Sequence, residues 1–200
     1  YHLHGPGGHI DLTDCSFSED EGGVTVRGSR FIADKERPMV KLEGARLTGY
    51  RTISIAGLRD PVMIEQIDSI LETVQARVSA TLSAEGIDGR LIFHIYGKNG
   101  VMEELEPVKT VTGHELGLII EGVGRNQAEA DSVCSIARST LLHYGYPGRI
   151  STAGNLAFPF SPSDIHGGEV YEFSIYHLMD TGGRPEKLFP LRTEEIAGKE

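Results

Sequence analysis

Residues 143–166, "HYGYPGRISTAGNLAFPFSPSDIH", hold most of the side chains in this sequence whose types and spacing could support binding or chemistry. An imidazole exchanges protons near neutral pH, hydroxyls and phenols donate hydrogen bonds, and a guanidinium pairs with a carboxylate or phosphate. The set therefore suits a ligand with a polar or anionic head. The candidate ligand-binding residues are His143, Tyr144, Tyr146, Arg149, Asn155, Ser161, Ser163, Asp164 and His166.

A structural interpretation accounts for the first of these residues equally well. His143 near the C-terminus of a helix is favoured by the helix dipole, Tyr144 packs, and Gly145 can supply a left-handed stop. We favour this structural interpretation for the run "LLHYGYPGR".

The run "NLAFPFSPSD" has two interpretations as well. Pro159 forces Phe158 into an extended conformation, which predicts an edge strand or wall, and Ser161-Pro162 predicts a capped helical turn. Such a wall could receive an acyl chain with a polar head, or it could seal the open edge of a sheet. We favour the sealing role.

Other patterns with chemical potential are incomplete. The sequence has no G-x-S-x-G, Walker or G-x-G-x-x-G motif, so no reaction is indicated and the catalytic residues stay unassigned. The imidazoles of His2, His4 and His9 could bind a metal, but a flexible Gly/Pro-rich start is costly to order. We therefore predict no metal and no cofactor.

The two cysteines, Cys15 and Cys134, have no metal-type spacing, and we expect both to be reduced thiols.

Length, composition and charge fit a cytoplasmic globular protein. The 200 residues, 39% hydrophobic and 24% charged, are enough for a sizeable core. The net charge of −10 argues against nucleic acid as a partner. No apolar run approaches the roughly 18 residues of a membrane span, and no secretory leader is present. Because the chain starts at Tyr1, we expect it to be part of a longer protein.

The periodicity of apolar residues predicts the α+β class. From Ile53 to Met179 the expected order is strand, helix, strand, strand, helix, strand, which is the ferredoxin-like β-α-β-β-α-β arrangement with both helices on one face of the sheet. N-terminal β-hairpins over residues 1–50 precede a core over 51–180 and a tail over 181–200. We expect one α+β domain.

Helix boundaries are predicted by local signals. Asp60 as N-cap, Pro61 at the first position and Gly86 as stop enclose the first helix. Asn126 and Glu129 form a capping box for the second. A break at Thr48-Gly49 is expected to divide the strands before the first helix.

Four runs carry a family resemblance: "HIYGKNGVMEELEP" (94–107), "ARSTLLHYGYPGR" (137–149), "AGNLAFPFSPSDI" (153–165) and "YEFSIYHLM" (171–179). On these runs the sequence resembles the C-terminal region of the acyclic terpene utilisation protein A family. The run "VKLEGARLTGYRTISIAG" (40–57) is similar to the Gly-rich strand pair of that family. The resemblance implies a role in bacterial breakdown of branched isoprenoid acids as coenzyme A thioesters, with no assigned reaction.

Two functions follow as hypotheses. In the first, the chain is a C-terminal assembly and ligand-contact domain that forms a homo-oligomer and binds its own N-terminal region and a small companion protein. In the second, it is an autonomous enzyme domain acting on a branched acyl-CoA or carboxylic acid through residues 143–166. The sequence leaves open whether it is an enzyme.

Overall fold

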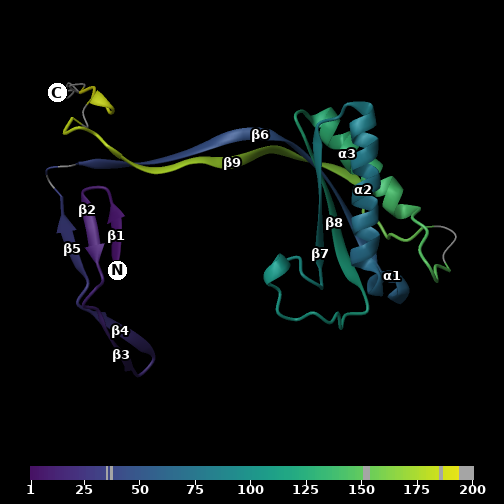
Figure 1. Ribbon diagram of the computed structural model, residues 1–200, viewed down its shortest axis with the longest axis horizontal. Coiled ribbons are helices and arrows are strands. Elements are labelled where there is room, and N and C mark those ends of the chain that lie inside the picture. Colours follow the sequence, from purple (N-terminus) through teal and green to yellow (C-terminus); the bar gives the residue numbers. More distant parts are fainter. Residues whose placement is uncertain (35, 37, 151–153, 185–186, 194–200) are drawn as a thin grey trace, which may run out of the picture. The chain divides into compact units, whose positions relative to one another are not determined.

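The computed structural model describes residues 1–200 except 35, 37, 151–153, 185–186 and 194–200 (Figure 1). The chain divides into two compact units: unit 1 is Tyr1–Arg46 with Phe173–Glu200, and unit 2 is Leu47–Glu172. Two strands, β6 (Met39–Leu58) and β9 (Asp164–Asp180), have residues in both units. Among the described residues, no helix combines the length and the apolar character needed to cross a membrane.

Unit 2 is an antiparallel sheet with helices, so the α+β class is confirmed. The sheet has the order β7-β8-β6-β9, in which β8 is antiparallel to both β7 and β6. The remaining elements of unit 2 are α1 (Pro61–Glu65), α2 (Ile67–Glu85), β7 (Gly89–Tyr96), the short 3-10 helix η1 (Glu103–Leu105), β8 (Leu116–Gly124) and α3 (Gln127–Leu142).

The core lies between the sheet and helices α2 and α3 (Figure 1). Alternate residues of β8 point to this side, so Leu116, Leu118 and Ile120 are almost fully buried. Helix α2 contributes an apolar stripe at three- and four-residue spacing, with Ile67 and Val74 fully buried. The predicted helix-covered face is therefore present, and no helix of the described residues covers the opposite face of the sheet.

Most predicted helix ends are confirmed. The side chain of Asp60 accepts from Val62 N at 3.0 Å, and Gly86 ends α2 with φ of 68°. Asn126 caps α3 by accepting from Glu129 N at 3.0 Å. Two details differ. The Glu129 carboxylate accepts from Arg125 N instead of Asn126 N, and the expected single first helix is divided at Gln66.

The prediction that Gly145 ends the second helix in the left-handed conformation is wrong. Helix α3 ends earlier, at Leu142 with His143 as its C-cap, and Gly145 does not have a positive φ. The predicted break at Thr48-Gly49 is also wrong, because β6 runs through it. A Cβ on Gly49 would lie 2.4 Å from Gly124 O, so this glycine allows two strands to approach closely instead of making a turn.

Unit 1 is built of short strands. Its three-stranded sheet has the order β1-β2-β5, and a separate hairpin pairs β3 with β4. This hairpin turns within the run "SEDEGG", in the N-terminal region where the sequence predicts β-hairpins. The strands are β1 (His2–Gly5), β2 (Gly8–Asp11), β3 (Ser16–Asp20), β4 (Gly23–Arg27) and β5 (Arg30–Ala33).

Candidate functional site

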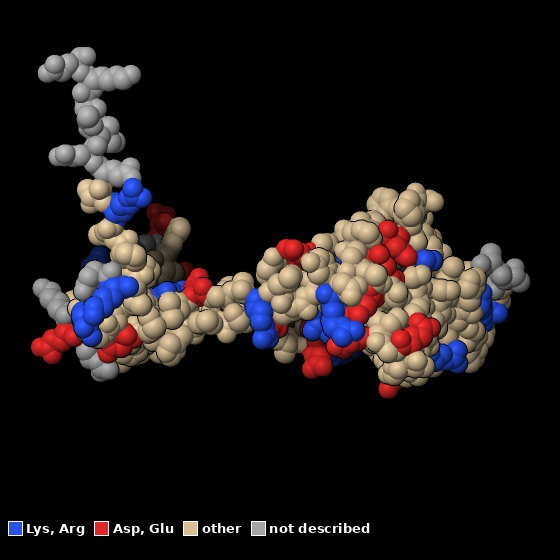
Figure 2. Space-filling model, turned by 90° about the horizontal axis from the view of Figure 1, so that it is seen from above, with Lys and Arg blue, Asp and Glu red and all other residues tan. Residues whose placement is uncertain are grey.

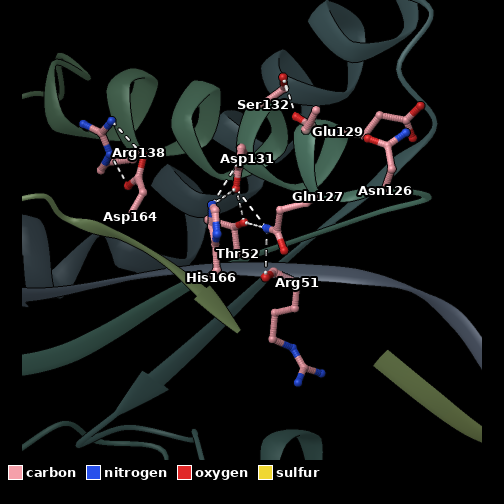
Figure 3. A network of polar contacts seen from close by, with 11 residues as sticks. Arg51, Thr52, Asn126, Gln127, Glu129, Asp131, Ser132, Arg138, Asp164 and His166 are labelled. Carbon is pink, nitrogen blue, oxygen red and sulfur yellow. Dashed lines mark hydrogen bonds and ion pairs between the residues drawn. The ribbon is translucent and has the colours of Figure 1, made fainter. Parts of the chain in front are cut away.

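A polar network joins helix α3 to strands β6 and β9, and it contains two of the sequence-predicted residues, Asp164 and His166 (Figure 3). At its centre is the carboxylate of Asp131 on α3. Thr52 Oγ1 donates to Asp131 Oδ1 at 2.5 Å, and Gln127 Nε2 donates to the same oxygen at 3.0 Å. The ring of His166 on β9 lies 3.2 Å from the Asp131 carboxylate.

The electrostatics of this network favour an ionised Asp131. Burial opposes ionisation, but hydrogen bonds from Thr52 and Gln127 and the neighbouring His166 outweigh it, so the pKa of Asp131 lies below its usual value. An Asp–His pair resembles the base of a catalytic triad, but the nearest hydroxyl, on Thr52, is fully buried and donates to Asp131. The group therefore fixes α3 to the sheet and presents no nucleophile.

Asp164 forms a bidentate ion pair with Arg138 on α3. Arg138 Nε donates to Oδ1 at 2.6 Å and Nη2 donates to Oδ2 at 3.0 Å. Both side chains are about three-quarters buried, and Ser163 Oγ adds a contact to Oδ1 at 3.3 Å. Both carboxylate oxygens of Asp164 accept hydrogen bonds from Arg138 of α3. Asp164 therefore attaches the start of β9 to the helix and is not available to bind a ligand.

Removing this pair should weaken the attachment of β9. Asp164→Asn keeps the shape of the side chain but loses the charge, and we expect the free energy of unfolding to fall by about 1–2 kcal/mol in urea denaturation. Asp68→Asn is the matched control, since Asp68 pairs with Lys98 but is 76% exposed. That control should change stability by less than about 0.5 kcal/mol. Equal losses of stability in the two variants would show that the Arg138–Asp164 ion pair does not stabilise the fold.

A second group of predicted residues caps the C-terminal end of α3. Arg149 Nη1 donates to the carbonyls of His143 and Tyr144 at 3.2 and 3.1 Å, and Asn155 Nδ2 donates to Tyr144 O at 2.8 Å. The Arg77 guanidinium lies 5.0 Å from the centroid of the Tyr144 ring. These contacts satisfy the carbonyls of the first two residues after α3, so Arg149 and Asn155 have a structural role at this helix end.

Tyr146 is buried, and its hydroxyl donates to Asp60, the N-cap of α1. Burial and the hydrogen bond to Asp60 raise the pKa of Tyr146 to about 12, so the phenol stays protonated. His143 and Ser161 are exposed. The predicted residues thus fall into two groups, the Arg138–Asp131 side of α3 and the end of α3, instead of one ligand site.

The segment from 154 to 163 seals the sheet edge at one point. Gly57 N donates to Ala157 O at 2.8 Å, and Ala157 N donates to Gly57 O at 3.0 Å. The segment therefore lies beside β6 just before β9 begins at Asp164. The predicted helical turn at Ser161 is wrong. Residues 161–163 are not helical, the Ser161–Pro162 peptide bond is cis, and β9 already begins at Asp164.

The aromatic wall also lines a pocket of about 460 Å³. Phe158 and Pro159 form one side, and Ile55, Gly57 and Gly117 contribute to the others. Of the described residues that line it, Glu115 alone is charged, and none supplies a cation for an acyl carboxylate. The pocket therefore suits an apolar group better than an anionic head.

An ionic cluster that was not predicted lies on the open face of the sheet. Glu121 of β8 is 7% exposed and accepts from Arg51 Nε at 2.6 Å, and His94 Nε2 lies 2.7 Å from its other oxygen. The available signal was a glutamate inside the apolar run "LGLIIEGVG". Burial opposes ionisation here too, but His94 and Arg51 together hold the pKa of Glu121 below its usual value.

Neither thiol is placed for nucleophilic chemistry. Cys134 lies on the buried side of α3, and desolvation with the nearby Asp164 charge raises its pKa to about 12. Cys15 is half-buried, and both cysteines are free. As the side chains lie, the described part of the chain holds no group of three or more His, Cys, Asp or Glu arranged for a metal ion.

Comparison with models of protein families, with curated proteins and with solved structures finds no match to this chain. On the visible side in Figure 2, Lys and Arg side chains are interspersed with Asp and Glu.

Proposed function

We propose that this chain is an assembly domain that forms a homo-oligomer through unit 1. The observation that carries the proposal is the distribution of burial: every buried apolar side chain of the described residues lies in unit 2. Unit 1 instead exposes large apolar side chains, a pattern typical of a surface that another polypeptide covers. They include Leu3, Phe17, Val24, Phe31, Phe173, Ile175, Tyr176 and Phe189.

The open edge of β6 in unit 1 supports a second copy as the partner. β8 pairs with β6 at Tyr50–Leu58, so residues 40–44 have β9 on one side and, among the strands that the structure describes, no partner on the other. Such an edge is a template for another strand. A two-fold axis at Leu42 would place Lys41 opposite the partner's Glu43, and this charge pattern is self-complementary.

The wider role rests on the family resemblance. It supports a parent protein in bacterial catabolism of acyclic isoprenoids, in which this domain contacts its own N-terminal region and a small companion protein. We also infer the ferredoxin-like arrangement for the core. The β-α-β-β-α-β chain order and the sheet order β7-β8-β6-β9 support it.

Charge reversal tests the proposed contact. Wild type should elute with twice the mass of one chain in size-exclusion chromatography with light scattering. Lys41→Glu and Glu43→Lys each place like charges opposite one another twice per dimer, and each should weaken association about tenfold. The double variant should restore it. A wild-type monomer at every concentration, or a double variant as weak as the single ones, contradicts the proposal.

The pocket beside Phe158 favours a second candidate, a site for a short branched acyl group. Its size and apolar lining support such a ligand. A thermal-shift screen with branched acyl-CoA thioesters and free acids tests it, because ligand at a hundred times its Kd adds about 2.7 kcal/mol. A shift that Phe158→Ala abolishes would support the enzyme hypothesis; a flat screen would leave assembly as the function.

A further inference from the structure

We infer that His2, His4 and His9 form a binding site for a divalent transition-metal ion such as zinc on the β1–β2 sheet of unit 1. The inference is independent of the proposed assembly. The sequence argued against a metal here because a flexible start is costly to order. That reason does not hold, because residues 2–5 and 8–11 are paired strands.

The register of the two strands brings the three imidazoles to one face. His2 and His4 are two residues apart on β1, and His4 lies directly opposite His9 on β2. Leu3 and Ile10 point to the other face. The ring centroids of His9 lie 5.0 Å from His2 and 5.3 Å from His4, and His2 and His4 are 6.5 Å apart.

These separations suit one shared ion. With zinc–nitrogen bonds of about 2.0–2.1 Å and tetrahedral angles, the rings of three coordinating imidazoles lie roughly 5 Å apart. Two of the three distances already have this value. As the side chains lie they do not converge on an ion, so the inference requires His2 and His4, which are both exposed, to rotate towards His9 when a metal binds.

Asp11 would orient one of the histidines by a hydrogen bond and would not itself bind the metal. Its carboxylate is occupied, because Oδ1 accepts from Thr13 N at 2.9 Å and Oδ2 accepts from Arg30 Nη2 at 3.2 Å. His2 Nδ1 lies 4.0 Å from Asp11 Oδ1. A hydrogen bond from Nδ1–H to this oxygen would leave the His2 Nε2 lone pair for the metal, as carboxylates beside metal-binding histidines do.

The ligand set selects the kind of ion. Three neutral imidazoles suit zinc, copper(II) or nickel, whereas magnesium and calcium require oxygen ligands. Three protein ligands also leave a fourth position for water, the arrangement of open zinc sites.

Titration of the EDTA-treated chain with zinc chloride by calorimetry tests the site, with visible absorption of cobalt(II) as the spectroscopic signature. We expect one ion per chain, and at least a tenfold weaker Kd in His4→Gln and in His9→Gln. Two controls should bind as wild type: Leu3→Gln, on the same strand but the opposite face, and His143→Gln, an exposed histidine directly after α3. Failure of wild type to bind zinc saturably, or unchanged binding in His4→Gln and His9→Gln, overturns the inference.

Discussion

Gly122→Ala should lower the free energy of unfolding by about 3 kcal/mol. Helix α3 lies directly on the backbone of β8 at this point. A Cβ on Gly122 would be 2.6 Å from Ala130 O and 2.7 Å from Cys134 N. Both atoms belong to the helix backbone, so no side-chain rotation relieves the clash and α3 must move away from the sheet.

Gly117→Ala is the matched control for this prediction. Gly117 is on the same strand but on the opposite face, where the nearest atom to an added Cβ is Tyr96 Cβ at 3.6 Å. Alanine at this position should be neutral, or stabilising by up to about 0.5 kcal/mol, because it restricts the unfolded chain. Chemical denaturation of the two variants measures the difference. Losses that differ by less than about 1 kcal/mol would contradict direct helix–strand contact at Gly122.

Glu121→Gln should cost about 2 kcal/mol at neutral pH, because it leaves Arg51 and His94 without their shared carboxylate. The effect should depend on pH. The pKa of folded Glu121 lies below the usual 4.5, so the carboxylate stabilises the fold fully above that pH. This stabilisation disappears as the pH falls through the folded-state pKa.

Urea denaturation of wild type and Glu121→Gln between pH 7 and pH 3 measures this dependence. The difference in stability should be constant above pH 4.5 and shrink below it. Glu72→Gln, on the exposed side of α2, should change stability by less than about 0.5 kcal/mol at every pH. A difference that persists undiminished at pH 3 would show that the glutamine variant loses packing and not charge.

The parts of the fold that the sequence predicts well are those encoded over a few residues. The Asp60-Pro61 start, the Gly86 stop and the Asn126 cap depend on neighbours within one helical turn, and all three are confirmed. Gly49 was misread because the same residue type serves turns and close strand contacts. Only the position of Gly124, far along the chain, decides between them.

The candidate site was predicted less well because its contacts are distant in sequence. The sequence identified Asp164 and His166, but their partners Arg138 and Asp131 are 26 and 35 residues away. The charge of Glu121 likewise has partners on two other strands. The turn predicted at Ser161 does not form, because its local signals compete with β9, which begins at Asp164 and is a neighbour of β6 in the sheet.

Strand β6 runs through both units, so its two ends should differ in local stability. Backbone amides of residues 50–58 lie in a central strand over the buried core and should exchange hydrogen with solvent only when unit 2 unfolds. Amides of residues 40–44, paired on one side and without a core, should exchange through small local openings. A partner strand at that edge would slow the hydrogen exchange of these amides. Exchange rates measured along β6 would therefore show whether residues 40–44 bind a partner.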